Sequence, residues 1–297
     1  MPEILVISGK GGTGKTSLTA AFAHIASDHV ICDLDVDAPD LHLILRPEQT
    51  VSHDFFSGYG ASVIRDKCES CGICAEMCRF GAVSGSPVPE INPLKCEGCK
   101  VCVSFCPADA IAFEEKHCGQ WYLSETRFGP MVHARLFPGE ENSGKLVTLL
   151  KQQAQKLAKE KGRSLILSDG TPGIGCPVIS SLSGTSLVVA VTEPTPSGLH
   201  DLERVIELCG YFRVPAGVIV NKSDLNENIS RKIRDFCREK GLTLLGYLPY
   251  DPVVTKAMVM AQAITEYCNN GFSDTIRNIW AAILKMLADE NMKQKTG

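Results

Sequence analysis

A glycine-rich segment near the start of the chain has the residues and the spacing needed to bind phosphate. Residues 9–16 read GKGGTGKT and satisfy the pattern G-x-x-x-x-G-K-[ST]. Glycines let the backbone curl so that successive N–H groups face phosphate oxygens, while Lys15 neutralises phosphate charge and Thr16 ligates Mg²⁺. The segment predicts a nucleotide site, with a plain glycine-rich turn as the alternative. The nucleotide-binding residues it predicts are Gly9, Lys10, Gly11, Gly12, Thr13, Gly14, Lys15, Thr16 and Ser17.

A second lysine in this segment, Lys10, narrows the class of nucleotide-binding protein. With it, the segment resembles the deviant Walker A motif of the MinD/ParA/Mrp ATPases and of the nitrogenase iron protein. The resemblance implies that Lys10 reaches the phosphates bound by a partner subunit, in a dimer that encloses the nucleotides. Lys10 and Lys15 are then both catalytic, and the partner is a second copy or a paralogue.

Two carboxylates follow predicted strands where this family has its switch segments. The resemblance implies that Asp35 orients the attacking water and that Asp169 lies near Mg²⁺ through a water molecule. Either carboxylate could instead cap the helix that follows it. Cys176 lies seven residues after Asp169, the spacing of the cysteine that holds an intersubunit cluster in the nitrogenase iron protein. A structural role is the alternative for this cysteine.

The segment 221–224 bears on which base the nucleotide carries. It reads Asn-Lys-Ser-Asp, which fits the N-K-x-D guanine motif of small GTPases and would indicate GTP. The family with the extra lysine instead uses an asparagine at this strand end to contact adenine. We therefore expect ATP rather than GTP, and Asn221 is the one residue of this segment that the resemblance implies for contact with the base. Residues 247–252 either close the base pocket or form an ordinary loop.

Eight of the fourteen cysteines form two copies of the spacing C-x2-C-x2-C-x3-C, which start 28 residues apart. The second copy continues to Pro107, and together the copies resemble the bacterial two-cluster ferredoxins. This resemblance implies two [4Fe–4S] clusters, each held by three thiolates of one copy and the fourth of the other; two zinc sites are the alternative. Arg79 stands where a proline is expected. A cation at this place would stabilise the reduced form of the second cluster, which carries more negative charge than the oxidised form. The expected ligands are Cys68, Cys71, Cys74 and Cys106 for the first cluster and Cys96, Cys99, Cys102 and Cys78 for the second.

Short apolar runs alternate with helical patterns along the rest of the chain. This alternation predicts an α/β fold, that of a P-loop NTPase with a mostly parallel sheet and helices on both faces. The cysteine block interrupts it, so we expect an ATPase domain over 1–60 and 119–297 and a small α+β ferredoxin-like domain over 61–118. Hinges are expected at Gly58, Gly60 and Gly119. Strands are expected at 3–8, 30–34, 164–167, 186–191, 216–220 and 242–245, and helices at 17–26, 146–161 and 273–287.

Composition and charge limit the classes of function that the sequence predicts. Hydrophobic residues make up 44% of the 297 residues and charged residues 22%, as in soluble globular proteins. We find no apolar run long enough to span a membrane and no basic leader, which predicts a cytoplasmic protein with no membrane partner. A net charge of −4 gives no overall basic field, so no nucleic acid partner is expected.

Together the motifs predict a slow, partner-stimulated ATP hydrolase that carries clusters. Its nucleotide state would control electron transfer to a redox partner, or metal–sulfur cofactor assembly on an acceptor protein. A positioning switch that binds membrane or DNA, and a plain electron carrier on an ATPase scaffold, are the alternatives.

Overall fold

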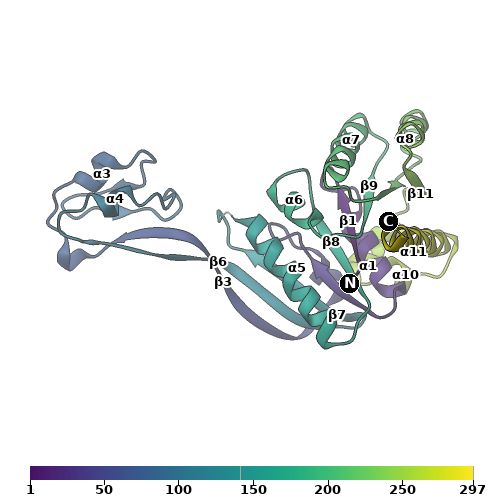
Figure 1. The fold of residues 1–297 in the computed structure, drawn as a ribbon, viewed down its shortest axis with the longest axis horizontal. Helices are drawn as coiled ribbons and strands as arrows, with labels where there is room; N and C mark the ends of the chain where they lie inside the picture. Colours follow the sequence, from purple (N-terminus) through teal and green to yellow (C-terminus); the bar gives the residue numbers. More distant parts are fainter. Residues whose placement is uncertain (141, 297) are drawn as a thin grey trace. The chain divides into compact units, whose positions relative to one another are not determined.

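The computed structural model describes residues 1–140 and 142–296 (Figure 1). Helices and strands alternate along the first and last parts of the chain, as expected. In order, the elements are β1 (Glu3–Ser8), α1 (Lys15–Ile25), β2 (His29–Asp33), α2 (Leu41–Leu45), β3 (Glu48–Val63), the 3-10 turn η1 (Arg65–Lys67), α3 (Ile73–Met77), β4 (Val83–Ser84), β5 (Glu90–Ile91), α4 (Val101–Ser104), β6 (Ile111–Thr126), β7 (Gly129–Leu136), α5 (Ser143–Glu160), β8 (Leu165–Pro172), α6 (Cys176–Leu182), β9 (Leu187–Thr192), α7 (Pro196–Tyr211), β10 (Ala216–Asn221), α8 (Glu227–Glu239), β11 (Thr243–Leu248), α9 (Val253–Val259), α10 (Ile264–Tyr267) and α11 (Gly271–Thr296).

One large sheet has the strand order β11-β10-β9-β1-β8-β2-β7-β6-β3. β1 lies between β8 and β9 and is parallel to both, and the pairs β9/β10, β10/β11, β2/β8 and β2/β7 are parallel too. Every residue of β1, β2 and β9 is buried, because these continuous apolar strands are covered on both faces. The predicted α/β fold with a mostly parallel sheet is confirmed.

The chain divides into two compact units, and each is described by itself. The first unit comprises Met1–His53, Trp121–Arg135 and Ser143–Gly297, and the second comprises Asp54–Gln120 and Leu136–Asn142. In the first unit, α1, α10 and α11 cover one face of the sheet, where Phe22 stacks on Trp280 with the ring centroids 5.2 Å apart. Because α5, α6 and α7 pack on β2, β8 and β9 from the other face, the core has two layers (Figure 1).

The expected helix over 273–287 lies within α11, and its apolar residues are buried. Ile276 and Ile283 are fully buried, and Ile279 packs so closely on Gly246 of β11 that a Cβ there would lie 2.7 Å from it. This helix therefore packs on the sheet. Among the described residues, none of the helices combines the length and the apolar character needed to cross a membrane.

The boundaries of the second unit differ from the expected domain 61–118. The long strands β3 and β6 continue from the first unit into the second, so the unit begins at Asp54, ends at Gln120 and also takes in Leu136–Asn142. Gly58, Gly60 and Gly119 lie inside these strands, and the expectation of hinges there stays a prediction. Most residues of β3 are exposed, so the strand lacks the apolar run by which buried strands are recognised.

Inside the second unit, the two copies of the cysteine spacing repeat their backbone shape. Three pairs of residues, each pair 28 positions apart, have left-handed conformations with positive φ. These pairs are Ser70 (57°) and Gly98 (61°), Gly72 (77°) and Lys100 (65°), and Gly81 (59°) and Asp109 (46°). The duplication in the sequence is therefore also a duplication of local structure.

Candidate functional site

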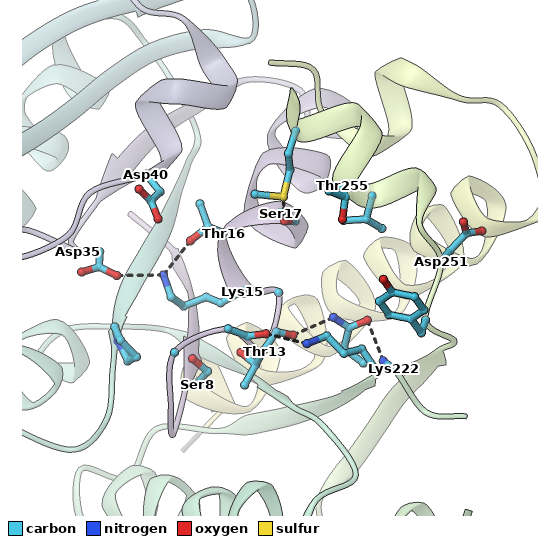
Figure 2. A pocket seen from close by; sticks show the side chains of 18 of the residues that line it. Ser8, Thr13, Lys15, Thr16, Ser17, Asp35, Asp40, Lys222, Asp251 and Thr255 are labelled. Carbon is cyan, nitrogen blue, oxygen red and sulfur yellow. Dashed lines mark hydrogen bonds and ion pairs between the residues drawn. The ribbon is translucent and has the colours of Figure 1, made fainter. Parts of the chain in front are cut away.

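A cavity of about 450 Å³ opens where β1 ends, a volume typical of small-molecule sites (Figure 2). The phosphate loop Gly11–Ser17 lines it, together with Asp35 and Asp40 after β2. The end of β10 and the segment from Pro249 to Met258 supply the rest of the lining, so part of the predicted base-pocket loop does border the cavity. In open parallel sheets, ligands bind outside the carboxyl ends of the strands, as this cavity does.

Glycine is required at different positions of the loop for different structural reasons. Gly12 and Gly14 have φ values of 79° and 89°, which side chains rarely adopt, and a Cβ at Gly14 would collide with the amide of Asn221. Gly9 does not line the cavity. Its missing side chain lets α7 approach, because a Cβ there would lie 2.8 Å from the backbone carbonyl atoms of Asp201. Among the predicted binding residues, Gly11 to Ser17 therefore line the cavity and Gly9 serves packing.

Lys15 and Asp169 form a buried ion pair at the base of the cavity. Lys15 Nζ lies 2.8 Å from Asp169 Oδ2, and the hydroxyl of Thr16 donates to the same oxygen at 2.8 Å. Thr19 donates to the other oxygen at 2.7 Å. Burial would lower the pKa of Lys15, but Asp169 and then Asp35 outweigh it and raise the pKa above its usual range. Lys15 is therefore charged, and the two residues expected near Mg²⁺, Thr16 and Asp169, meet at one point.

The carboxylates after β2 lie beside this pair. Asp35 Oδ2 is 3.7 Å from Lys15 Nζ, and burial raises the pKa of Asp35 to about 6 against the opposing effect of Lys15. Asp33 is 1% exposed, and burial, with a further contribution from Asp169, raises its pKa well above the usual range. Its Oδ1 accepts the Asp35 N–H at 3.1 Å, while its buried Oδ2 has no hydrogen-bond partner. Asp35 is therefore ionised at neutral pH with a pKa suited to proton transfer.

The alternative role of these carboxylates as helix caps is wrong. The N-cap residue of α2 is Asp40 and that of α6 is Gly175, so neither Asp35 nor Asp169 caps the helix that follows it. Cys176 is exposed at the first position of α6.

Lys10 does not line the cavity. Its Nζ lies 2.6 Å from Glu193 Oε1 and donates to the hydroxyls of Thr195 at 3.2 Å and Ser197 at 3.1 Å. Glu193 Oε2 accepts from Lys222 Nζ at 3.0 Å, so one carboxylate bridges two lysines. Burial would raise the pKa of Glu193, but the hydrogen bonds from both lysines lower it. The sequence reasoning missed Glu193, although its place directly after a parallel strand was a usable signal.

The segment after β10 holds the phosphate loop instead of offering a guanine site. Asn221 lines the cavity, and its Nδ2 donates to the carbonyl of Thr13 at 2.8 Å while its Oδ1 accepts the N–H of Lys222 at 3.0 Å. Asp224 Oδ1 accepts the backbone N–H of Tyr250 at 2.6 Å, and Asp224 does not line the cavity. The carboxylate that a guanine motif needs is therefore absent from the cavity lining.

The eight repeated cysteines surround two further cavities in the second unit. None is in a disulfide. Each cavity has a volume of about 20 Å³. The first cavity is lined by Cys68, Cys71, Cys74 and Cys106, and the second by Cys78, Cys96, Cys99 and Cys102. These are the two sets that the sequence analysis expected, so the fold brings each set together.

Backbone amides also point at these thiols. The N–H of Ala110 donates to Cys106 Sγ at 3.3 Å and the N–H of Ala82 donates to Cys78 Sγ at 3.4 Å. In the part of the chain that the structure describes, no three His, Cys, Asp or Glu side chains converge closely enough for a single metal ion. The role of the cysteines as iron ligands stays a prediction.

Comparison with known proteins identifies the family. The model of the CobQ/CobB/MinD/ParA nucleotide binding domain matches residues 4–262. The uncharacterized protein MJ0578 of Methanocaldococcus jannaschii is 35% identical over 239 residues, which cover 79% of this chain and 82% of the relative.

Solved structures share the fold. The septum site-determining protein MinD from Pyrococcus horikoshii, solved with Mg-ADP, has a TM-score of 0.58 and 16% identity and covers 97% of this chain and 98% of its own. MinD in the MinC:MinD cell division complex of Aquifex aeolicus has a TM-score of 0.55 and 16% identity, with 96% of each chain covered. From the family match, the chain belongs to the CobQ/CobB/MinD/ParA nucleotide-binding domain family.

Proposed function

We propose that this protein is an ATPase whose nucleotide state controls an iron–sulfur module. Through that module it would pass electrons to a partner protein or assemble a metal–sulfur cofactor on it. The observation that carries the proposal is the pair of four-cysteine cavities in a chain of a nucleotide-binding family. The proposal includes no nucleic acid or membrane partner.

The residues around each cysteine cavity fit a [4Fe–4S] cluster. Four free thiols surround one space, most of the other lining residues are apolar, and a backbone N–H donates to one thiol of each set. Thiolates hold such clusters, while hydrogen bonds to sulfur and apolar surroundings tune them. When bound, the clusters would supply one-electron transfer. The chain's own contribution is to hold them and to limit the access of water.

Four polar residues at or beside the nucleotide cavity would take part in ATP hydrolysis. Lys15 would neutralise the phosphates, and Thr16 would ligate Mg²⁺ with Asp169 beside it. Asp35, whose pKa is raised to about 6, would orient the attacking water. The exclusion of Asp224 from the cavity lining supports ATP rather than GTP, and the P. horikoshii fold neighbour bound Mg-ADP.

Lys10 would act in a dimer. In the single chain it is held by Glu193, so it would have to leave that carboxylate to reach phosphates bound by the other subunit. The other subunit is a second copy or a paralogue of this chain. A separate acceptor protein would then receive electrons or cofactor, as the A. aeolicus MinD works in a complex with MinC.

Iron and sulfide analysis of anaerobically isolated protein tests the proposal. We expect about eight iron and eight acid-labile sulfide per chain, four for each cluster. Cys78→Ser should lower both to about four, because one cavity loses a ligand. The matched control is Cys118→Ser, a buried thiol of the same unit that lines neither cavity and should leave the content unchanged. Two zinc ions and no sulfide would end the proposal.

The coupling of the two modules needs a separate measurement. If nucleotide state controls the clusters, ATP affinity must differ between oxidised and reduced protein, and by linkage the midpoint potential must shift equally. A tenfold affinity ratio corresponds to about 59 mV for a one-electron couple. Equal affinities and equal hydrolysis rates in both redox states would favour the plain electron carrier.

A positioning switch is the second candidate. The structural neighbours named as septum-site and cell division proteins favour it. Co-sedimentation with lipid vesicles and with DNA, with and without ATP, distinguishes it, because only a positioning switch should bind either surface in a nucleotide-dependent way.

A further inference from the structure

We infer that the two cysteine cavities are electrostatically unequal, so that an electron taken up by the protein resides on the cluster of the second cavity. This inference rests on the proposed function, because it requires both clusters to be present. It assigns to Lys100 and Arg79 a role that neither the sequence duplication nor the family match provides: these two cations determine which of the two clusters holds the added electron.

The 28-residue duplication allows the surroundings of the two cavities to be compared position by position. Glu69 and Gly72 line the first cavity, and their counterparts Glu97 and Lys100 line the second. The duplication therefore places a carboxylate at both cavities but a lysine at the second cavity alone.

Cys78 and Cys106, the two crossing cysteines, each line the cavity formed mainly by the other copy of the repeat. The residues that follow these two cysteines differ in charge in the same direction. Arg79 follows Cys78 of the second cavity, whereas the residue after Cys106 of the first cavity is Pro107. Two positions further on, Asp109 follows Cys106 in the chain, and its counterpart after Cys78 is Gly81. The backbone N–H of Asp109 donates to the carbonyl of Cys106 at 3.4 Å. The first cavity is thus lined by one carboxylate and no cation, with Asp109 close to Cys106 in the chain, while the second is lined by one carboxylate and Lys100, with Arg79 next to Cys78 in the chain.

Several other charges of the unit are shared between the two copies or are paired. Lys67 and Lys95 precede the two copies equally. Arg65 forms an ion pair with Glu90. Glu76 lies between a cysteine of the first cavity and one of the second along α3, so it favours neither.

The remaining contributions of the protein are closely matched between the cavities. Each has one backbone amide that donates to the thiol of its crossing cysteine, at 3.3 and 3.4 Å, and each has the same left-handed backbone positions. At the second cavity, Lys100 Nζ lies 5.7 Å from the ring centroid of Phe113, which also lines that cavity. This cation–π contact favours a position of the ammonium group over the cavity.

Net charge around a cluster is one of the main determinants of its potential. An added electron makes the cluster more negative, so nearby cations stabilise the reduced form and carboxylates oppose it. Two unit charges about 4 Å apart in a water-like dielectric change an equilibrium constant about fivefold. Because three positions differ in the same direction, we expect the electron to favour the second cluster at least about tenfold, which corresponds to about 59 mV.

A redox titration of the full chain, followed by electron paramagnetic resonance, tests the inference. The duplication supplies matched variants, because Lys100 and Gly72 occupy equivalent left-handed positions, with φ of 65° and 77°. A Cβ at Gly72 would meet no atom within 4 Å, so a lysine fits there. Lys100→Gly, or Lys100→Gln as a second variant with a longer side chain, should lower the higher midpoint potential. The expected shift corresponds to a change of about fivefold in the equilibrium constant for electron uptake. Gly72→Lys should raise the lower midpoint by a similar factor.

The combined exchange Gly72→Lys with Lys100→Gly should bring the two midpoints together. The separation in the parent protein should also narrow as salt is raised, because the charged groups are exposed. Fully loaded protein in which both clusters titrate at one potential would overturn the inference and leave the proposed function standing. A Lys100 variant that shifts the lower midpoint potential, or that shifts neither midpoint potential, would also overturn the inference. Absence of iron and sulfide would overturn both.

Discussion

Replacement of Asp35 by asparagine tests whether the fold holds this carboxylate ionised at an energetic cost. Burial raises the pKa of Asp35 from 3.8 to about 6, although Lys15 Nζ lies 3.7 Å away. One pKa unit corresponds to about 1.4 kcal/mol, so the shift gives an upper limit of about 3 kcal/mol. The side chain is 14% exposed, and solvent screening reduces the expected effect to about 1 to 2 kcal/mol.

The direction of the effect follows from proton linkage. The folded protein binds the Asp35 proton more tightly than the unfolded chain does, so this group favours folding when it is protonated. That contribution is fully present below about pH 4 and is lost as pH rises through about 6. Asparagine carries no charge at any pH. Asp35→Asn should therefore be more stable than the parent at pH 8, with a smaller gain at pH 5.

Thermal unfolding of nucleotide-free protein, followed by circular dichroism at pH 5 and pH 8, measures the difference. For a domain of this size, about 1 to 2 kcal/mol corresponds to a rise in Tm of about 3 to 6 °C at pH 8. The control is Asp40→Asn, an exposed carboxylate on the same segment, which should change Tm little. The same Asp35 variant should hydrolyse ATP about 10²- to 10⁴-fold more slowly while still binding it. An unchanged or lower Tm at pH 8, or an equal gain at both pH values, would refute the reasoning.

Further substitutions distinguish the roles of four residues of the phosphate loop. Lys15→Ala should weaken ATP binding strongly, measured by calorimetry, because Lys15 is the cation inside the cavity. Lys10→Ala should bind ATP normally but fail to dimerise in sedimentation with ATP; normal dimerisation and the parental hydrolysis rate would exclude a role across the interface. Gly9→Ala should lower the free energy of unfolding by about 1 to 3 kcal/mol, because a Cβ would lie 2.8 Å from the backbone of α7. Gly11→Ala, where a Cβ meets no atom within 4 Å, is its matched control in denaturant unfolding and should have a much smaller effect.

The central strands could be predicted because their signal is local. β1 and β9 are unbroken apolar runs next to a loop motif or a helix, and such runs have few other uses in a soluble chain. β3 could not be predicted in this way, because most of its side chains are exposed and its polar residues resemble a loop. The same strand shows why glycines such as Gly58 are hard to interpret from the sequence: glycine inside a strand also occurs where the backbone bends or packs closely.

The candidate site shows the same division between local and long-range information. The phosphate loop and the cysteine sets follow from spacing alone, since the ligand geometry is encoded within a few residues. The contact between Lys10 and Glu193 joins residues far apart in the sequence, and only the meeting of strand ends in space brings them together. The raised pKa of Asp35 depends equally on tertiary structure, because burial is its largest cause.

The side chains at the end of β10 have a consequence for the thermodynamics of binding. Asn221 and Lys222 donate to the carbonyls of Thr13 and Gly12, at 2.8 and 2.9 Å. With these carbonyls engaged, the loop adopts its shape during folding and not when a ligand arrives. Binding then avoids the loss of conformational entropy that ordering a flexible loop requires, typically about 0.5–1.5 kcal/mol for each immobilised side chain. The entropy of nucleotide binding should accordingly contain little contribution from ordering of the loop itself.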